Sequence, residues 1–158
     1  MRIQLLVIGK TAEGYLREGI AVYEKRLRRY PYPFSLEVVP DVKFGGKMSE
    51  EVLKKHEAEA LLGKINPEDT VILLDERGRQ RSSPQLAEFI EEQVHRGTRR
   101  LVFVIGGAFG FGEAVYDRAD GQLSLSKMTF THQMIRLFIV EQLYRAMTIL
   151  RNEGYHNE

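Results

Sequence analysis

Cysteine is absent from this sequence of 158 residues, and its absence excludes several kinds of chemistry. A protein without cysteine has no disulfides, no thiolate metal ligands and no cysteine nucleophile. Long apolar runs are absent too. The opening MRIQLLVIGK is too short and too rich in β-forming residues for a signal peptide, and no later run could span a bilayer. The sequence therefore predicts a soluble cytoplasmic protein with no membrane partner.

The chain has no strong charge imbalance, since it contains 23 Lys and Arg residues and 22 Asp and Glu residues. A protein that held naked RNA through its phosphates alone would usually be more basic. Low-complexity tracts, repeats and interdomain linkers do not occur, and the content of 43% hydrophobic residues is typical of a globular protein. The chain is predicted to form a single domain over residues 1–158.

Apolar segments rich in β-forming residues alternate with segments of helical periodicity along the chain. The segments predicted to be strands are RIQLLVIG, FSLEVVP, TVILLD, RLVFVIGG and 122–125. Helices are predicted at 12–30, from Ser49 to near Gly63, at 85–96 after a cap at Ser83, after Gly112, and from about 132 to 150. This alternation favours an α/β fold, with a small, largely parallel sheet flanked by helices.

The last predicted helix is apolar on two sides. Ile135, Phe138 and Ile139 belong to one apolar stripe, and Met134 and Leu137 belong to a second. A helix that lies on one face of a sheet does not need such a wide apolar surface, so this helix is either central or also packs on another subunit. We expect a homodimer that buries the Met134/Leu137 side.

Four glycines directly follow the fourth predicted strand, in VFVIGGAFGFG. Ligands of open parallel sheets bind beyond the carboxyl ends of the strands, and glycine lets the backbone approach them closely. A Walker loop is excluded because Gly-Lys-Ser/Thr does not follow, and a dinucleotide fold is disfavoured because the first strand ends with the lone Gly9. The alternative for these glycines is an ordinary tight turn.

A second polar loop lies between a predicted strand and the last helix, in LSLSKMTFTHQMIRLF at 123–138. An ordinary strand-to-helix connection would explain this stretch taken alone. Together with the glycine loop and the end of TVILLD, however, it would form a cleft at one edge of the sheet. The sequence therefore predicts a ligand site built from these three segments.

The motifs TVILLDERG, FVIGGAFG, LSLSKMTFTHQMIR, EQLYRA and the C-terminal GYH together resemble the RlmH family. Members of this family are SPOUT-class methyltransferases that act on a pseudouridine of large-subunit ribosomal RNA, and the resemblance covers essentially the whole chain. It implies a SPOUT α/β-knot, in which the C-terminal segment threads through a loop to form a trefoil knot. It also implies S-adenosylmethionine as the cofactor, N3 of the pseudouridine as the methyl acceptor, and the assembled ribosome as the partner.

The resemblance places the cofactor contacts on the end of the third strand, the glycine loop and the second polar loop, and it implies no metal. The residues are Leu74, Gly107, Ser126, Lys127, Met128, Thr129, Phe130 and Thr131. Backbone groups of a tight loop can read the edge of an adenine, while apolar side chains cover its faces. The family usually has proline where this chain has Thr131, and a threonine can instead cap the first helical turn with its hydroxyl.

The resemblance further implies that His132, Arg145, Tyr155 and His156 meet the RNA. Methyl transfer to N3 requires alignment of the methyl group with the ring nitrogen and loss of the N–H proton. Arg145 would bind a phosphate or the developing negative charge, or it would form an ordinary i,i+4 pair with Glu141 on a solvated face. Tyr155 would stack on a base. His132, His156 or a water could take the proton. The last four residues are expected to contribute nothing to the core.

Basic clusters at 24–32, 77–81 and 95–100 could meet ribosomal RNA or form an ordinary solvated surface. The cluster at 77–81 is favoured as an RNA contact because it follows the strand that ends at Leu74. The alternative to an enzyme is a non-catalytic nucleotide- or RNA-binding module that uses the same glycine loop. The YRA and GYH motifs argue against this alternative, because a pure binding module does not need them.

Overall fold

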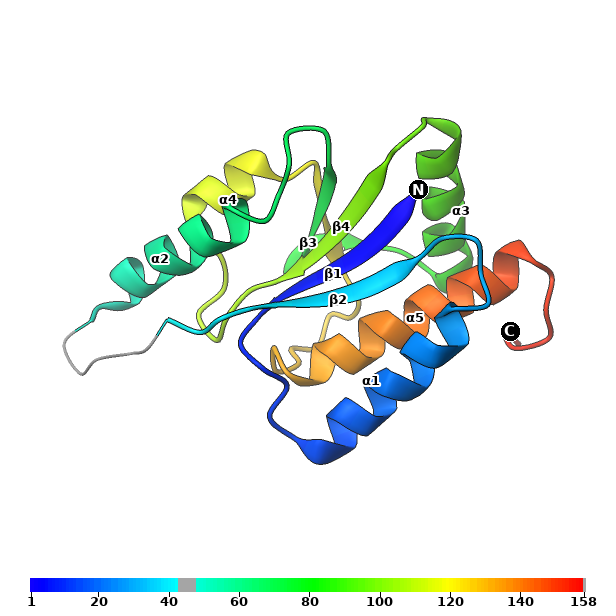
Figure 1. Ribbon diagram of the computed structural model, residues 1–158, viewed down its shortest axis with the longest axis horizontal. Helices are drawn as coiled ribbons and strands as arrows, with labels where there is room; N and C mark the ends of the chain where they lie inside the picture. The colour runs from blue at the N-terminus through cyan, green and yellow to red at the C-terminus, as the bar shows by residue number, and fades with distance from the viewer. Residues whose placement is uncertain (43–47, 158) are drawn as a thin grey trace.

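The computed structural model describes residues 1–42 and 48–157 and contains a five-stranded sheet (Figure 1). The strands are β1 (Arg2–Ile8), β2 (Phe34–Val39), β3 (Thr70–Gln80), β4 (Arg100–Ile105) and β5 (Gly121–Ser124). They lie in the order β2-β1-β4-β3-β5, and every neighbouring pair is parallel. The predicted α/β fold with a parallel sheet is confirmed.

Helices cover both faces of this sheet. They are α1 (Gly14–Leu27), α2 (Glu50–Leu62), α3 (Ser83–His95), α4 (Glu113–Arg118) and α5 (Met134–Leu150). On one face α5 packs against both α1 and α3, and on the other face α2 packs against α4 (Figure 1). Within the described residues, none of the helices is long and apolar enough to cross a membrane.

The central strands β1 and β4 send alternate side chains into two separate cores. In β1, Leu5 and Val7 face the core beneath α1, α3 and α5, whereas Leu6 and Ile8 face the core beneath α2 and α4. In β4, Phe103 packs in the first of these cores. A strand that is covered on both faces needs apolar residues at successive positions, which explains why RIQLLVI and RLVFVI show no polar alternation.

Serine side chains fix the starts of two helices. Ser49 caps α2 as predicted, since its hydroxyl accepts a hydrogen bond from the Val52 N–H over 3.3 Å. The cap of α3 is Ser82 rather than the predicted Ser83. The reason is a capping box, in which the Ser82 hydroxyl accepts from the Gln85 N–H over 3.3 Å and the Gln85 side chain accepts from the Ser82 N–H over 2.9 Å.

Strand β3 is longer than predicted, because it pairs with β5 twice. The pairing stops after Leu74 and resumes at Arg79. Both Leu74 and Arg79 pair with Leu123, so residues 75–78 lie outside the regular ladder. Gly78 crosses β5 closely: a Cβ at this position would lie 2.7 Å from backbone atoms of Leu123, so no larger residue fits without displacing the strand. The trefoil knot that the resemblance implies stays a prediction.

Candidate functional site

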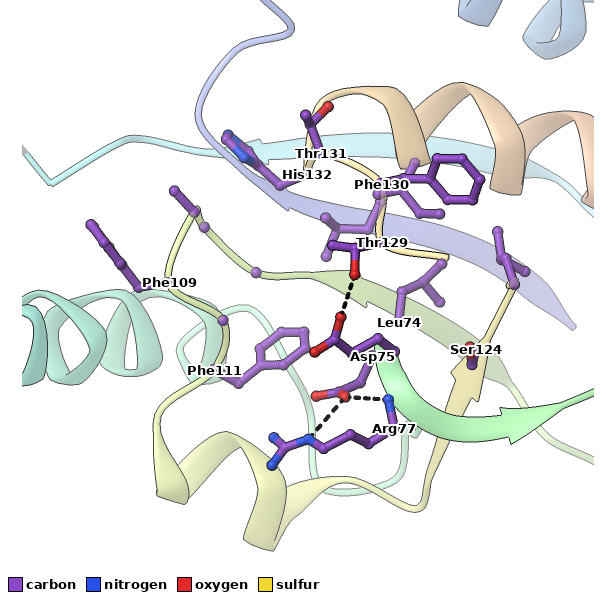
Figure 2. A pocket seen from close by; sticks show the side chains of 18 of the residues that line it. Leu74, Asp75, Arg77, Phe109, Phe111, Ser124, Thr129, Phe130, Thr131 and His132 are labelled. Atoms are coloured by element: carbon purple, nitrogen blue, oxygen red, sulfur yellow. Dashed lines mark hydrogen bonds and ion pairs between the residues drawn. The ribbon is translucent and has the colours of Figure 1, made fainter. Parts of the chain in front are cut away.

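A cleft of about 960 Å³ opens at the C-terminal edge of β3, β4 and β5. Its walls come mainly from residues 74–77, 105–111, 123–126 and 128–132. Figure 2 shows how side chains from these segments surround one space. These are the segments that were expected to form a cleft, and the structure confirms that they meet.

The glycine loop after β4 turns back on itself between Gly107 and Gly110. The Gly110 N–H donates to the Gly107 carbonyl over 3.1 Å, and Gly110 has a φ of +81°, where glycine is favoured. Gly107 lines the cleft, but the space beside its Cα is already filled. A Cβ at this position would lie 2.5 Å from Oε1 of Glu57, a buried residue of α2. A residue larger than glycine at position 107 would therefore have to displace the Glu57 side chain.

Side-chain hydrogen bonds fix the polar loop after β5. The Ser124 hydroxyl donates to the Ser126 carbonyl over 2.8 Å, and the Ser126 hydroxyl accepts from the Met128 N–H over 2.9 Å. The Thr129 hydroxyl donates to the Glu76 carboxylate over 2.9 Å (Figure 2). The loop is thus tied both to the strand that precedes it and to the neighbouring strand β3.

Most of the residues assigned to the cofactor line the cleft. Thr131 also caps α5 as predicted, since its hydroxyl accepts from the Met134 N–H over 3.1 Å. Met128 is 74% exposed and Phe130 is 40% exposed, so both present apolar surface to a ligand. Lys127 is exposed as well but does not belong to the cleft lining, unlike the other seven residues assigned to the cofactor.

Asp75 is a cleft residue whose role the sequence patterns did not indicate. Its side chain, only 8% exposed, accepts hydrogen bonds from the Tyr116 hydroxyl and, over 2.8 Å, from the Arg77 N–H. Burial opposes ionisation, but these hydrogen bonds outweigh it and lower the pKa of Asp75. The Arg77 guanidinium donates to the Tyr116 hydroxyl over 2.9 Å and completes one wall of the cleft. Tyr116 lies 41 residues after Asp75, so only the fold brings them together.

His132 lines the cleft and is half-buried. Burial and the nearby Arg136 guanidinium lower the pKa of its imidazole, against a smaller opposing effect of the Asp41 carboxylate. The imidazole is therefore mostly neutral at neutral pH. A neutral imidazole has a free lone pair, so His132 can accept a proton inside the cleft.

Arg136 holds the start of α5 against the end of β1. It is fully buried, at 0% exposed. Its guanidinium donates to the carbonyls of Ile8 and Gly9 over 2.6 and 2.8 Å. It also donates to the Thr11 hydroxyl over 3.2 Å and to the His132 carbonyl over 3.1 Å. The end of β1 therefore helps to fix the position of the cofactor loop.

The other residues expected to meet the RNA lie together near the C-terminal end of α5, whereas the cleft lies at the start of this helix. The Arg145 guanidinium donates to Glu141 over 2.6 Å and lies 3.3 Å from Nδ1 of His156. It also lies 4.7 Å from the centroid of the Tyr155 ring, and the Tyr155 hydroxyl donates to Glu141 over 2.9 Å. About 16 Å of helix separates Met134 from Arg145. A single chain therefore does not bring this C-terminal cluster to its own cleft.

The C-terminal tail is packed on the helices that precede it. The Tyr155 ring lies 4.8 Å from the Tyr144 ring, and its hydroxyl lies 3.4 Å from that of Tyr23. The Tyr30 hydroxyl donates to Glu153 over 2.6 Å. The expectation that the last four residues contribute nothing to the core is wrong, because aromatic rings from α1 and α5 form a surface on which Tyr155 packs.

The predicted basic clusters have different surroundings. Arg77 is exposed and lines the cleft, whereas Arg81 lies 4.8 Å from the ring centroid of Phe89. Arg100 forms an ion pair with the buried Asp69, so it serves the fold. Among residues 1–42 and 48–157, no group of three or more His, Cys, Asp or Glu side chains could hold a metal ion.

The chain is similar to known proteins over its whole length. Residues 1–156 match the family described as "Predicted SPOUT methyltransferase". A protein of Parabacteroides distasonis named "Ribosomal RNA large subunit methyltransferase H" is 51% identical over 158 residues. A protein of the same name from Porphyromonas gingivalis is 49% identical over 158 residues, and both alignments cover 100% of each chain.

Solved structures of low sequence identity share the fold. A probable methyltransferase from Bordetella pertussis Tohama I has a TM-score of 0.53 at 11% identity, and the match covers 92% of this chain and 96% of that one. A putative methylase family protein from Neisseria gonorrhoeae has a TM-score of 0.52, also at 11% identity, over 90% of this chain and 81% of that one.

Proposed function

The chain belongs to the SPOUT methyltransferase family, and we propose that it transfers a methyl group from S-adenosylmethionine to N3 of a pseudouridine in large-subunit ribosomal RNA. The observation that carries this proposal is the meeting of three distant segments in one cleft. They are the segments that the RlmH resemblance assigns to the cofactor. Two relatives named as large-subunit ribosomal RNA methyltransferases, similar over their full length, support the choice of RNA.

The cleft fits a ligand with the size and chemistry of S-adenosylmethionine. Its volume of about 960 Å³ is near the upper end of the range usual for small-molecule sites. Leu74, Met128 and Phe130 offer apolar surface to an adenine ring, and the glycine loop offers backbone groups without intervening side chains. The cofactor, when bound, supplies an electrophilic methyl group on a sulfonium centre.

Residues of the chain would position the RNA base and remove its proton. His132 lines the same cleft, and its neutral imidazole can accept the N3 proton. Arg145 can stabilise the negative charge that the base gains when it loses this proton. His156, which lies beside Arg145, is a second candidate for the proton acceptor, and Tyr155 offers a ring on which a base can stack.

We further propose a homodimer in which each cleft is completed by the C-terminal cluster of a second copy. The separation of cleft and cluster along α5 supports this arrangement, since one chain does not bring them together. Exposed apolar surface is available on α5, where Phe138 is 37% exposed and lies 4.9 Å, between ring centroids, from Phe130.

The apolar face of α5 proposed for the dimer interface differs from the Met134/Leu137 side that was expected from the sequence. Leu137 is partly buried within its own chain, because α1 covers it. Its Cδ1 lies 3.0 Å from the position that a Cβ of Gly19 would take. Phe138 therefore replaces Leu137 in the proposed interface.

Phe138→Glu should convert the dimer into a monomer, because an interface would have to bury an unpaired carboxylate. Sedimentation at micromolar concentration measures this, with Val22→Glu as the control, since Val22 is 47% exposed on α1. The control should remain dimeric. The monomeric variant should still bind cofactor but lose methylation. A wild-type protein that sediments as a monomer would contradict the dimer.

Mass spectrometry of ribosomal RNA tests the proposed function. Ribosomes from cells that lack the gene should gain one methyl group on a pseudouridine of the large-subunit RNA when they are incubated with the protein and S-adenosylmethionine. Small-subunit RNA in the same sample should stay unchanged and serves as the internal control. Cofactor binding without methylation of any ribosomal substrate would instead favour a non-catalytic binding module.

A further inference from the structure

Glu57 is a buried acid that the proposed mechanism does not use. It lies on α2 and is only 8% exposed. Within the part of the chain that the structure describes, its side chain has no hydrogen-bond or ion-pair partner. Buried carboxylates are usually paired, because removal of a charge from water is costly unless another group compensates it. A largely buried acid without a protein partner beside the cleft carries a negative charge that a cationic ligand can offset.

The Glu57 carboxylate lies against Gly107, a residue that lines the cleft. Its two oxygens are 2.5 and 2.7 Å from the position that a Cβ of Gly107 would take, and the Gly107 backbone lines the cleft. The carboxylate is therefore in contact with a residue of the cleft wall, although Glu57 itself is not part of the lining. The charge of Glu57 can therefore act on the ligand across the glycine loop.

The charged groups around Glu57 do not neutralise it. The Asp41 carboxylate, which follows β2, adds further negative charge and, after burial itself, is the second cause of the raised pKa of Glu57. Lys54, one turn earlier on α2, lines the cleft but forms no ion pair with Glu57 in the described structure. His132 lines the cleft from the start of the last helix, and its lowered pKa keeps it mostly neutral.

The acids that line the cleft differ from Glu57, because their charges are offset. The charge of Asp75 is offset by hydrogen bonds from Tyr116 and Arg77. Glu76 is exposed and accepts a hydrogen bond from Thr129, so water screens its charge. Glu57 alone among these acids is buried and uncompensated in the described residues.

We infer that Glu57 determines the charge specificity of the cofactor site, because its carboxylate favours the positively charged sulfonium cofactor over the neutral thioether product. This inference rests on the proposed function. Methyl transfer moves a CH₃ group from sulfur to N3, so the sulfur loses its positive charge while N3 gives its proton to a base. The two ligands thus differ by one methyl group and one charge. A site that senses this charge holds the substrate and releases the product.

The test compares the two ligands by calorimetry at about pH 8, well above the ordinary pKa of a glutamate side chain. Glu57→Gln keeps the shape of the side chain and removes its charge. It should weaken binding of S-adenosylmethionine by about tenfold, the order expected for one charge at an effective dielectric near 20, and leave binding of S-adenosylhomocysteine almost unchanged. Glu57→Asp, which keeps the charge, should retain most of the wild-type preference.

Glu59→Gln is the matched control, because Glu59 lies on the same helix with its side chain 66% exposed and should affect neither ligand. Equal weakening of both ligands in Glu57→Gln would overturn the inference and leave Glu57 with a structural role at Gly107. If Glu57→Gln left the binding of both ligands unchanged, the ratio of the two affinities would not change either, and this result would also overturn the inference. A wild-type protein that binds neither ligand would instead contradict the proposed function.

Discussion

Arg145→Ala should lower the rate of ribosome methylation by about a hundredfold to a thousandfold, the usual effect of losing one group that stabilises charge in a transition state. Glu141 and His156 hold the guanidinium on two sides, and the Tyr155 ring lies 4.7 Å from it. The positive charge is therefore fixed before the substrate arrives, and alanine removes it without reaching the cofactor cleft. Single-turnover methylation of ribosomes measures the rate, and calorimetry should show nearly unchanged cofactor affinity.

The matched control is Arg151→Ala, at the same end of α5. Arg151 is exposed and contacts the ring of Tyr30 at 5.3 Å from the ring centroid, so it shares the location of Arg145 but not its hydrogen bonds to Glu141. Methylation by this variant should stay within a fewfold of wild type. A near wild-type rate for Arg145→Ala would remove the C-terminal cluster from the reaction, and the base's charge would then have to be stabilised within the cleft.

Point variants test the role of the C-terminal cluster in methylation better than removal of the tail does. Because Tyr155 packs on Tyr144 and donates to Glu141, deleting residues 155–158 would also disturb the end of α5. Tyr155→Phe keeps the ring contact and removes only the hydroxyl. It separates the packing of the tail from its polar contacts.

Arg136→Met should lower the free energy of unfolding by about 3 kcal/mol or more, because it leaves buried backbone carbonyls without donors. The guanidinium is 0% exposed and donates to the carbonyls of Ile8 and Gly9 at the end of β1. Methionine fills a similar volume, so the loss reports mainly the hydrogen bonds. Urea unfolding followed by circular dichroism measures the change.

Arg99→Met is the control for this substitution, since Arg99 is exposed beside β4 and its replacement should change stability by less than about 0.5 kcal/mol. If both variants were equally stable, the contacts of Arg136 would contribute nothing net to the fold. The position of His132 would then have to depend on other contacts of the loop.

The sheet and the cleft could be predicted because their causes are local in the sequence. The apolar runs of β1 and β4 indicate strands buried on both faces, and parallel strands place their C-terminal loops at one edge. The glycine loop and the loop at 126–131 therefore had to lie near each other once the fold class was known. The hydroxyl cap at Thr131 likewise follows from residue type and position alone.

The features that could not be predicted depend on contacts between segments that are distant in the sequence. The return of β3 to β5 after Leu74 depends on the close crossing at Gly78, and the polar sequence there resembles a loop. The space beside Gly107 is filled by the Glu57 side chain, which comes from α2, 50 residues earlier in the chain. The burial of Arg136 in an otherwise apolar helix is explained only by carbonyls at the end of β1.

Helix α5 follows all five strands in the chain, and this order has a consequence for synthesis. Until residues 134–150 leave the ribosome, the core that α1 and α3 share with α5 is only partly covered, and β3 is an open sheet edge until β5 arrives. The nascent chain must therefore keep this surface from misassembling without help from the cofactor, because the loop at 126–131 is not yet available to bind it. Cofactor binding can stabilise only the finished chain, and the growing chain depends on its own partial core.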